Sequence, residues 1–125
     1  MQTISTNNAP QAIGPYSQGK IVGNLIFISG QIALNTNGEF INGDVSIQSV
    51  QVLENLKAIL ENAESRLDDV IKTTVFLSDM NDFEAMNAVY ARYFNEHKPV
   101  RSTIAVKTLP KNAKVEIECI AVKQC

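Results

Sequence analysis

The sequence predicts an α+β fold in which two helices cover one face of a single sheet of about five strands. The first observation behind this prediction is the order of the patterns, which runs strand-strand-helix-strand-helix-strand-strand. The second is that each helical pattern carries one apolar stripe. The third is that several predicted strands are apolar on both faces, whereas a sheet wetted on one side should alternate. Two helices cannot cover both faces, so we expect an oligomer in which sheets of neighbouring subunits pack together.

The composition indicates one globular domain spanning residues 1–125. A chain of 125 residues can hold one core but not two, and its 45% hydrophobic and 19% charged residues argue against disorder. The net charge of −2, without a cluster of lysine and arginine, makes nucleic acid an unexpected partner. Cys119 and Cys125 do not have the spacing of a disulfide framework or a zinc site, and the single histidine, His97, cannot build a metal cluster. We therefore expect no bound metal.

The sequence carries no evident targeting signal. Its first eight residues lack the basic region and apolar core of a signal peptide. No apolar run approaches membrane-spanning length. We expect a cytoplasmic protein without a membrane partner.

The segment 8–16 predicts an ordered loop, because it contains two prolines and a glycine. Tyr16 ends this loop directly after a tight bend that can aim one side chain. Its ring either packs on the core with the hydroxyl in water, which is the commoner case, or contacts a ligand. The second case requires Tyr16 to lie near Arg101.

Two strands follow this loop, at residues 17–22 and 25–33, joined by a glycine-first turn that favours a hairpin. The pair Ser29-Gly30 is unusual within a strand, because glycine weakens a strand. It marks either a simple bulge or a place where a ligand approaches the backbone.

The first helix is predicted to begin at Asp44 or Ser46, either of which can cap it, and to run to about Ala63. Its polar residues, among them Gln48 and Asn55, lie mostly off the apolar stripe. The stripe consists of Val52, Leu53, Leu56, Ile59, Leu60 and Ala63. This pattern is typical of a helix that packs on the core without a catalytic role.

A further strand at residues 70–78 leads into a second helix at about 83–96. Asn87 shares a side of this helix with aromatic residues. A polar amide in such surroundings must find a hydrogen-bond partner. That partner is either neighbouring backbone or a group in a functional site.

Residues 99–122 contain the strongest candidates for a site. Two β-rich runs flank a turn at 109–112, which predicts a pair of strands with a short connection. Arg101 opens the first run, and Glu116 and Glu118 share one face of the second. An arginine and carboxylates at the edge of an apolar surface suit a small anionic substrate and a catalytic water. The alternative is an internal ion pair of Arg101 with Glu116 or Glu118.

A series of motifs runs in order along nearly the whole chain: Ala12-Ile-Gly-Pro-Tyr-Ser-Gln-Gly19, Ser29-Gly-Gln-Ile32, Lys72-Thr-Thr-Val-Phe-Leu77, Asn81-Asp-Phe83, Pro99-Val-Arg-Ser-Thr103, Leu109-Pro-Lys111 and Val115-Glu-Ile-Glu-Cys-Ile-Ala121. Together they resemble the RidA subgroup of the reactive intermediate deaminases, also called the YjgF family. The resemblance implies a chorismate-mutase-like fold of the bacillus type, with a mixed sheet of five to six strands. It also implies a homotrimer whose sheets form a central β-barrel, with a cleft between each pair of subunits.

The activity implied by the resemblance is hydrolysis of short-lived 2-enamine and 2-imine acids, such as 2-aminoacrylate and 2-iminobutanoate, to 2-oxo acids and ammonia without a cofactor. By position, Arg101 corresponds to the carboxylate-binding arginine of the family and Glu116 to the glutamate that holds the water. Tyr16 matches the tyrosine that contacts the substrate. Ser29 and Gly30 match the strand segment that lines the cleft.

Two further residues complete the candidate site. Thr103 stands where many members of the family have cysteine, so a contact made by the backbone would be kept and a contact made by the thiol would be changed. Asn87 is included as a substrate-binding candidate. Val100 stands where alanine is usual, which would narrow the cleft slightly.

A rival interpretation assigns the chain to another functional class. Members of this family are also associated with ligand sensing, regulation of other proteins, chaperone-like protection and RNA cleavage. Under this interpretation Arg101 captures a carboxylate metabolite without turnover. Cleavage of RNA has little support in a chain with an acidic balance and one histidine.

Overall fold

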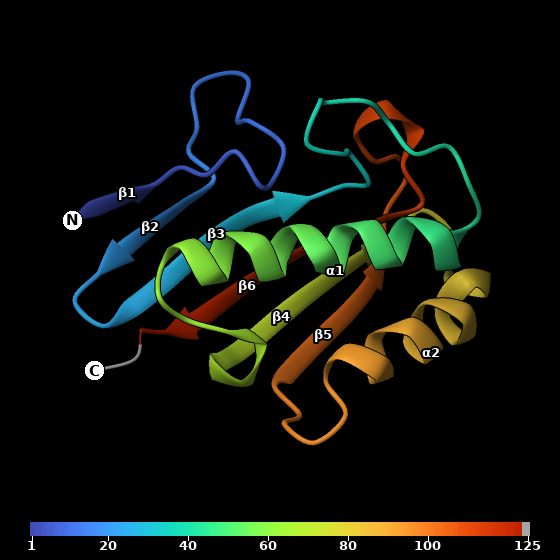
Figure 1. Cartoon of the computed structure of the whole chain (residues 1–125). Helices are drawn as coiled ribbons and strands as arrows, with labels where there is room; N and C mark the ends of the chain where they lie inside the picture. The colour runs from blue at the N-terminus through green and yellow to red at the C-terminus, as the bar shows by residue number, and fades with distance from the viewer. Residues whose placement is uncertain (124–125) are drawn as a thin grey trace.

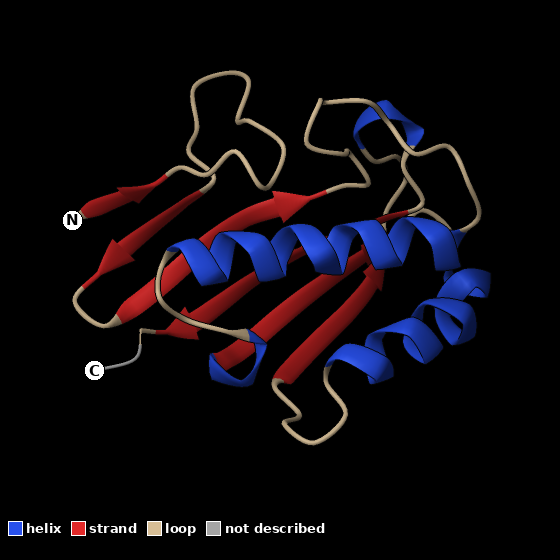
Figure 2. Cartoon of the chain, in the orientation of Figure 1, coloured by secondary structure: helices blue, strands red, loops and turns tan. Residues whose placement is uncertain are grey.

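Six strands form one sheet, and the two long helices lie on the same face of it (Figures 1 and 2). The computed structural model describes residues 1–123, so Cys125 lies outside the described residues. The elements in chain order are β1 (Gln2–Ile4), β2 (Gly19–Val22), β3 (Leu25–Gln31), α1 (Val45–Asn62), η1 (Leu67–Asp69), β4 (Val70–Leu77), η2 (Met80–Asp82), α2 (Phe83–Tyr93), β5 (Val100–Ala105), η3 (Pro110–Asn112) and β6 (Val115–Val122), where η marks a short 3₁₀ helix. The strand order is β1-β2-β3-β6-β4-β5, and only the pair β4–β5 is parallel. The predicted mixed sheet with both helices on one face is confirmed.

The last two strands are arranged differently from the prediction. Both form, but β4 lies between β5 and β6 and pairs with each of them. The connection 106–114 passes the end of β4, where Val106 N donates to Leu77 O and Ser78 N donates to Lys114 O. The prediction of a directly paired β5 and β6 is therefore wrong, and a whole strand separates them.

Two further differences concern the ends of elements. The short strand β1 was not predicted, because three residues are too few to show an alternating pattern. The second helix ends at Tyr93 rather than at Glu96, because Phe94 already leaves helical geometry with φ −117° and ψ 51°. The predicted hairpin of β2 and β3 is confirmed, and so is the loop at 8–16.

The two faces of the sheet differ in their cover. Along β6 every second residue from Val115 to Ala121 is buried, and the residues between them point to the face without helices. That open face exposes large apolar side chains, namely Val22, Phe27, Val100 and Ile104. The two-sided apolar pattern of the strands thus reflects one face packed under helices and one left uncovered by this chain.

The helix α1 fixes the segments that will matter for the site. Asp44 caps it by accepting a hydrogen bond from Ile47 N at 2.9 Å, as predicted. Gln48 and Asn55, expected off the apolar stripe, are instead buried. Gln48 Oε1 accepts from Lys114 N at 2.8 Å, and Asn55 Nδ2 donates to the carbonyl oxygens of residues 32 and 34. These two amides tie the helix to the start of β6 and to the chain after β3.

The centre of the sheet holds a buried cysteine. Cys119 on β6 lies opposite Ile28 of β3 and Thr73 of β4. Burial, with a smaller contribution from the charge of Glu118, raises the pKa of the Cys119 thiol to about 12. The thiol therefore stays protonated at neutral pH.

None of the helices within residues 1–123 combines the length and the apolar character needed to span a bilayer.

Candidate active site

Arg101 lies on the edge strand β5 and points toward α2. Its Nη1 donates a hydrogen bond to Asn87 Oδ1 at 2.7 Å. Its guanidinium carbon lies 4.7 Å from the centre of the Tyr90 ring and 5.5 Å from that of the Phe83 ring. Residues 83, 87 and 90 recur at helical spacing, so one face of α2 presents all three. The guanidinium is thereby held in one place before any ligand arrives.

The alternative of an internal ion pair is wrong for this chain. Within residues 1–123 no carboxylate lies within ion-pairing distance of Arg101. One amide oxygen accepts from the guanidinium, which carries more N–H donors than that oxygen can use. The remaining donors are available to a ligand carboxylate.

The space in front of this arginine is a cavity of about 400 Å³. Arg101, Asn87 and Tyr90 line it, together with Phe94, Lys98 and Pro99. An aromatic wall beside two cations suits a small acid with an apolar body.

Glu116 lies on the opposite face of the sheet. Arg101 is paired with Thr73 of β4, and Thr73 is buried on the helix side. Glu116 is paired with Phe76, an odd number of residues further along β4, so its side chain points to the open side. The expectation that Arg101 and the carboxylate of Glu116 lie together at one edge of the sheet is therefore wrong for a single copy. A single copy separates them across the sheet.

Glu116 opens into a second cavity of about 340 Å³, which it shares with Tyr16, Gly30 and Lys111. Burial, with the charge of Glu118 as the smaller cause, raises the pKa of Glu116 above the ordinary carboxyl value. Such a carboxylate binds a proton more readily than a solvated one. It can therefore accept a proton from water and return it.

Gly30 leaves room for this carboxylate. The register between β3 and β6 shifts between Ile28 and Gln31, so the predicted bulge exists. A Cβ atom at Gly30 would lie 2.5 Å from Glu116 Oε2. The glycine is thus needed for the close approach of Glu116, and the approach of a ligand to this backbone stays a prediction.

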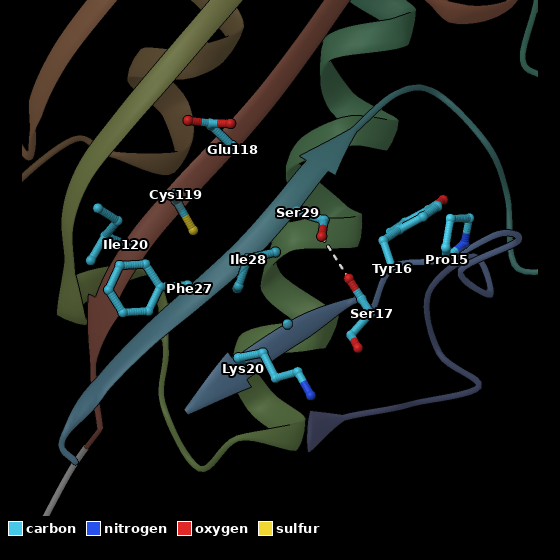
Figure 3. A pocket seen from close by; sticks show the side chains of 11 residues that line it. Pro15, Tyr16, Ser17, Lys20, Phe27, Ile28, Ser29, Glu118, Cys119 and Ile120 are labelled. Carbon is cyan, nitrogen blue, oxygen red and sulfur yellow. Dashed lines mark hydrogen bonds between the residues drawn. The ribbon is translucent and has the colours of Figure 1, made fainter. Parts of the chain in front are cut away.

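Tyr16 and Ser29 lie around the loop that precedes β2. Tyr16 is 55% exposed and lines both the Glu116 cavity and a hollow of about 490 Å³ on the open face, drawn in Figure 3. Ser29 Oγ donates to Ser17 O at 2.6 Å, shown as a dashed line in Figure 3. Ser29 thus holds the end of the loop that carries Tyr16. Tyr16 does not share a cavity with Arg101 in one copy.

Thr103 lies two residues after Arg101 and points to the same side of β5. Its hydroxyl is buried and has no hydrogen-bond partner within residues 1–123. A buried hydroxyl without a partner costs stability. The Thr103 hydroxyl therefore carries a polar cost that the described residues do not offset.

The candidate residues thus form two groups. Arg101, Asn87 and Thr103 lie at β5 on the helix side, whereas Tyr16, Gly30 and Glu116 lie around β3 and β6 on the other. No group of three or more metal-ligating side chains gathers within the described part of the chain.

Three site residues were missed by reasoning from the sequence. Phe83 and Tyr90 are among the aromatic residues that share a side of α2 with Asn87, but no role beside Arg101 was predicted for them. Lys111 lines the Glu116 cavity with φ 57°, and Asn112 follows with φ 55°. Left-handed backbone at a non-glycine residue has no reliable signal in a sequence.

A family model described as Endoribonuclease L-PSP matches residues 6–123. The chain belongs to this family, which is the YjgF family of the motif comparison. The chain is 49% identical over 126 residues to the 2-iminobutanoate/2-iminopropanoate deaminase of Escherichia coli, with 98% of each chain covered. It is 50% identical over 122 residues to a candidate regulator, AldR, of Lactococcus lactis, with 97% of each covered. A crystal structure of a Thermotoga maritima protein superposes with a TM-score of 0.97 at 49% identity, covering 100% of this chain and 99% of that one.

These relatives differ in their names. The similarity extends over nearly the full length of this YjgF-family chain in each case, so the matched region includes the positions of both groups of site residues. The names include an imine deaminase and a candidate regulator. The family therefore narrows the activity without deciding between turnover and sensing.

The pKa of Glu116 is expected to depend on the charge of the neighbouring Glu118. In Glu118→Gln the repulsive charge is removed, so the ionised form of Glu116 is favoured and its pKa falls toward the ordinary value without reaching it, because burial remains. Carboxyl-detected NMR titration measures this shift. Glu61→Gln, on the exposed surface of α1, is the matched control and should leave the pKa of Glu116 unchanged. An unaltered Glu116 titration in Glu118→Gln would contradict the assigned cause.

Proposed function

We propose that this protein hydrolyses 2-imino acids, in equilibrium with their 2-enamine forms, to 2-oxo acids and ammonia. The observation that carries the proposal is the guanidinium of Arg101, which is oriented by α2 and has donors that no carboxylate of residues 1–123 occupies. Arginine is suited to grip a carboxylate with two parallel hydrogen bonds. The identity with a named imine deaminase supports the same choice.

The chemistry requires only a few groups. Arg101 binds the substrate carboxylate and so fixes the adjacent carbon, C2. Glu116 accepts a proton from water as the water oxygen bonds to C2 of the protonated imine and the C2–N double bond becomes single. Glu116 passes this proton to the nitrogen, the C2–N bond breaks with ammonia as the leaving group, and Glu116 takes the remaining hydroxyl proton as C2 becomes a carbonyl. Tyr16 is placed to hydrogen-bond the substrate, and the raised pKa of Glu116 suits both directions of proton transfer.

The site is proposed to form between copies of the chain in a homotrimer. Arg101 and Glu116 lie on opposite faces of one sheet, so a single copy cannot bring them to one substrate. The exposed apolar residues of the open face and the free edge of β5 are surfaces on which a neighbouring copy can pack. In this arrangement Arg101 and Thr103 of one copy face Tyr16, Gly30 and Glu116 of the next.

The direct test uses an imine that a second enzyme generates in the assay mixture. Added to a threonine dehydratase reaction with semicarbazide as trap, the protein should divert 2-iminobutanoate from the semicarbazone to 2-oxobutanoate. Arg101→Ala should lower this activity by about 10²–10⁴-fold, because two charged hydrogen bonds of about 1.5–3 kcal/mol each are lost. Arg66→Ala, at an exposed arginine far from the cavity in sequence, is the control. Full activity of a correctly assembled Arg101→Ala variant would refute the role of the arginine.

The shared site predicts complementation between inactive variants. The variants Arg101→Ala and Glu116→Gln, unfolded and refolded together in equal amounts, should regain about a quarter of the wild-type rate. In randomly mixed trimers, about a quarter of the shared sites combine an intact Arg101 from one copy with an intact Glu116 from the next. Light scattering should show three copies of 13.7 kDa for each variant alone. Mixed trimers with no more activity than the separate variants would place the site within one copy.

Gly30 gives a test of the position of Glu116. In Gly30→Ala the new Cβ would lie 2.5 Å from Glu116 Oε2, so the carboxylate must move. Imine hydrolysis should fall by about 10²-fold or more, the contribution typical of a general base. The unfolding midpoint should change little, because the displaced atoms are the end of a flexible side chain. A large loss of stability, or normal activity, would contradict this account.

A second candidate function is a carboxylate-binding regulatory module. The similarity to AldR supports it. The contacts that orient Arg101 would serve carboxylate binding without turnover equally well. Calorimetry that detects 2-oxobutanoate binding by a trimer without imine hydrolysis would favour this function over the first.

A further inference from the structure

The arginine that binds the carboxylate needs to be held in one orientation. An arginine side chain has many rotamers, and ordering such a side chain on binding costs about 0.5–1.5 kcal/mol. Asn87 fixes one edge of the guanidinium of Arg101 at Nη1. One hydrogen bond still allows rotation about its own axis, so the face of the guanidinium requires a second support.

The ring of Tyr90 supplies that support. Its centre lies 4.7 Å from the guanidinium carbon of Arg101, closer than the 5.5 Å of Phe83. It also contacts the Phe94 ring, with centroids 4.7 Å apart and an interplanar angle of 40°. The ring of Tyr90 is therefore the nearer of the two aromatic surfaces that contact the guanidinium.

The ring is itself fixed by a hydroxyl on the sheet. The hydroxyl groups of Tyr90 and Thr73 share a hydrogen bond of 2.6 Å in the buried layer between α2 and β4. Thr73 is fully buried and is the residue of β4 paired with Arg101 on β5. The same stretch of sheet thus anchors both the arginine backbone and the ring under its side chain.

Packing alone does not require these two hydroxyls. Phenylalanine and valine would fill the same space without desolvating polar groups, and replacing both partners of such a pair by apolar groups can be nearly neutral for stability. Burial raises the pKa of Tyr90, so the phenol remains protonated and able to share the bond. The pair has therefore a reason beyond stability.

We propose that Thr73 and Tyr90 are positioning residues for the carboxylate-binding arginine, with the hydroxyl pair setting the tilt of the ring on which the Arg101 guanidinium rests. This inference rests on the proposed function of Arg101. The shared hydroxyl bond does not touch the substrate in this account, although the ring of Tyr90 lines the cavity in front of Arg101. Both residues act by reducing the rotamer freedom that Arg101 loses when a carboxylate binds.

The test compares Thr73→Val, Tyr90→Phe and the double variant with wild type. Each single variant should raise KM for the imine and Kd for 2-oxobutanoate by about two- to tenfold, the range set by the ordering cost of one long side chain, with kcat changed less than twofold. Because the two hydroxyls act as one unit, KM and Kd of the double variant should not exceed those of the single variant with the higher values. Thr73→Ser keeps the hydroxyl and should retain wild-type values.

Tyr93→Phe is the matched control. It removes a hydrogen bond made by a tyrosine hydroxyl of the same helix, the 2.8 Å bond that Tyr93 donates to Glu54 Oε2. The contacts of Arg101 with Asn87 and Tyr90 remain. Its KM and Kd should equal those of wild type. Equal KM and Kd in Tyr90→Phe and in this control would overturn the proposal.

A third readout does not depend on catalysis. The Arg101 Nε–Hε NMR resonance, assigned by its loss in Arg101→Lys, should be shifted by the ring in wild type and should move toward the free-arginine position in Thr73→Val and Tyr90→Phe. If wild type hydrolyses no imine, the proposed function fails while this resonance and Kd still test the positioning role. An Arg101 resonance that neither variant moves would refute that role.

Discussion

The alternation of side chains along β-strands separates the two charged groups on which the candidate site depends. Arg101 shares the helix side of the sheet with Thr73, whereas Glu116 emerges on the open side beside Gly30. No choice of rotamer brings a guanidinium and a carboxylate together through an intact sheet. Under the proposed function, the uncovered face and the free edge of β5 are therefore needed to bring the two charged groups together.

This separation also preserves the properties of each group. A carboxylate paired with Arg101 in the free chain would have a lowered pKa, and a substrate acid would have to displace it. Here Asn87 and the rings of α2 hold the arginine without neutralising it. Burial and the charge of Glu118 instead raise the pKa of Glu116. Neither group is neutralised by an ion pair within residues 1–123.

The sequence was sufficient for the two long helices and for every strand except β1. The periodicity around Leu53 and the β-rich run at 115–122 correspond to α1 and β6, since those stretches are long enough for a clear pattern. The pairing of β5 with β4 was not predictable, because local patterns do not specify which strand lies beside which. The use of Asn87 to hold Arg101 could not be predicted either, since it depends on the docking of α2 against that edge of the sheet.

The buried amides show the same limit. Gln48 and Asn55 look like surface residues of an amphipathic helix, yet each bonds backbone that lies far away in the chain. Their partners flank β3 and β6, the strands that carry Gly30 and Glu116. Such contacts depend on tertiary structure, and a pattern of hydrophobicity does not contain them.

The protonated thiol of Cys119 has a consequence for observing the fold itself. Alkylating reagents attack the thiolate, and both burial and the raised pKa suppress that form while β6 stays between β3 and β4. Because the thiol lies on the helix side of the sheet, modification of Cys119 requires the layer that covers it to open. With the terminal cysteine replaced by serine, the rate of alkylation under native conditions becomes a direct measure of the free energy of that opening event.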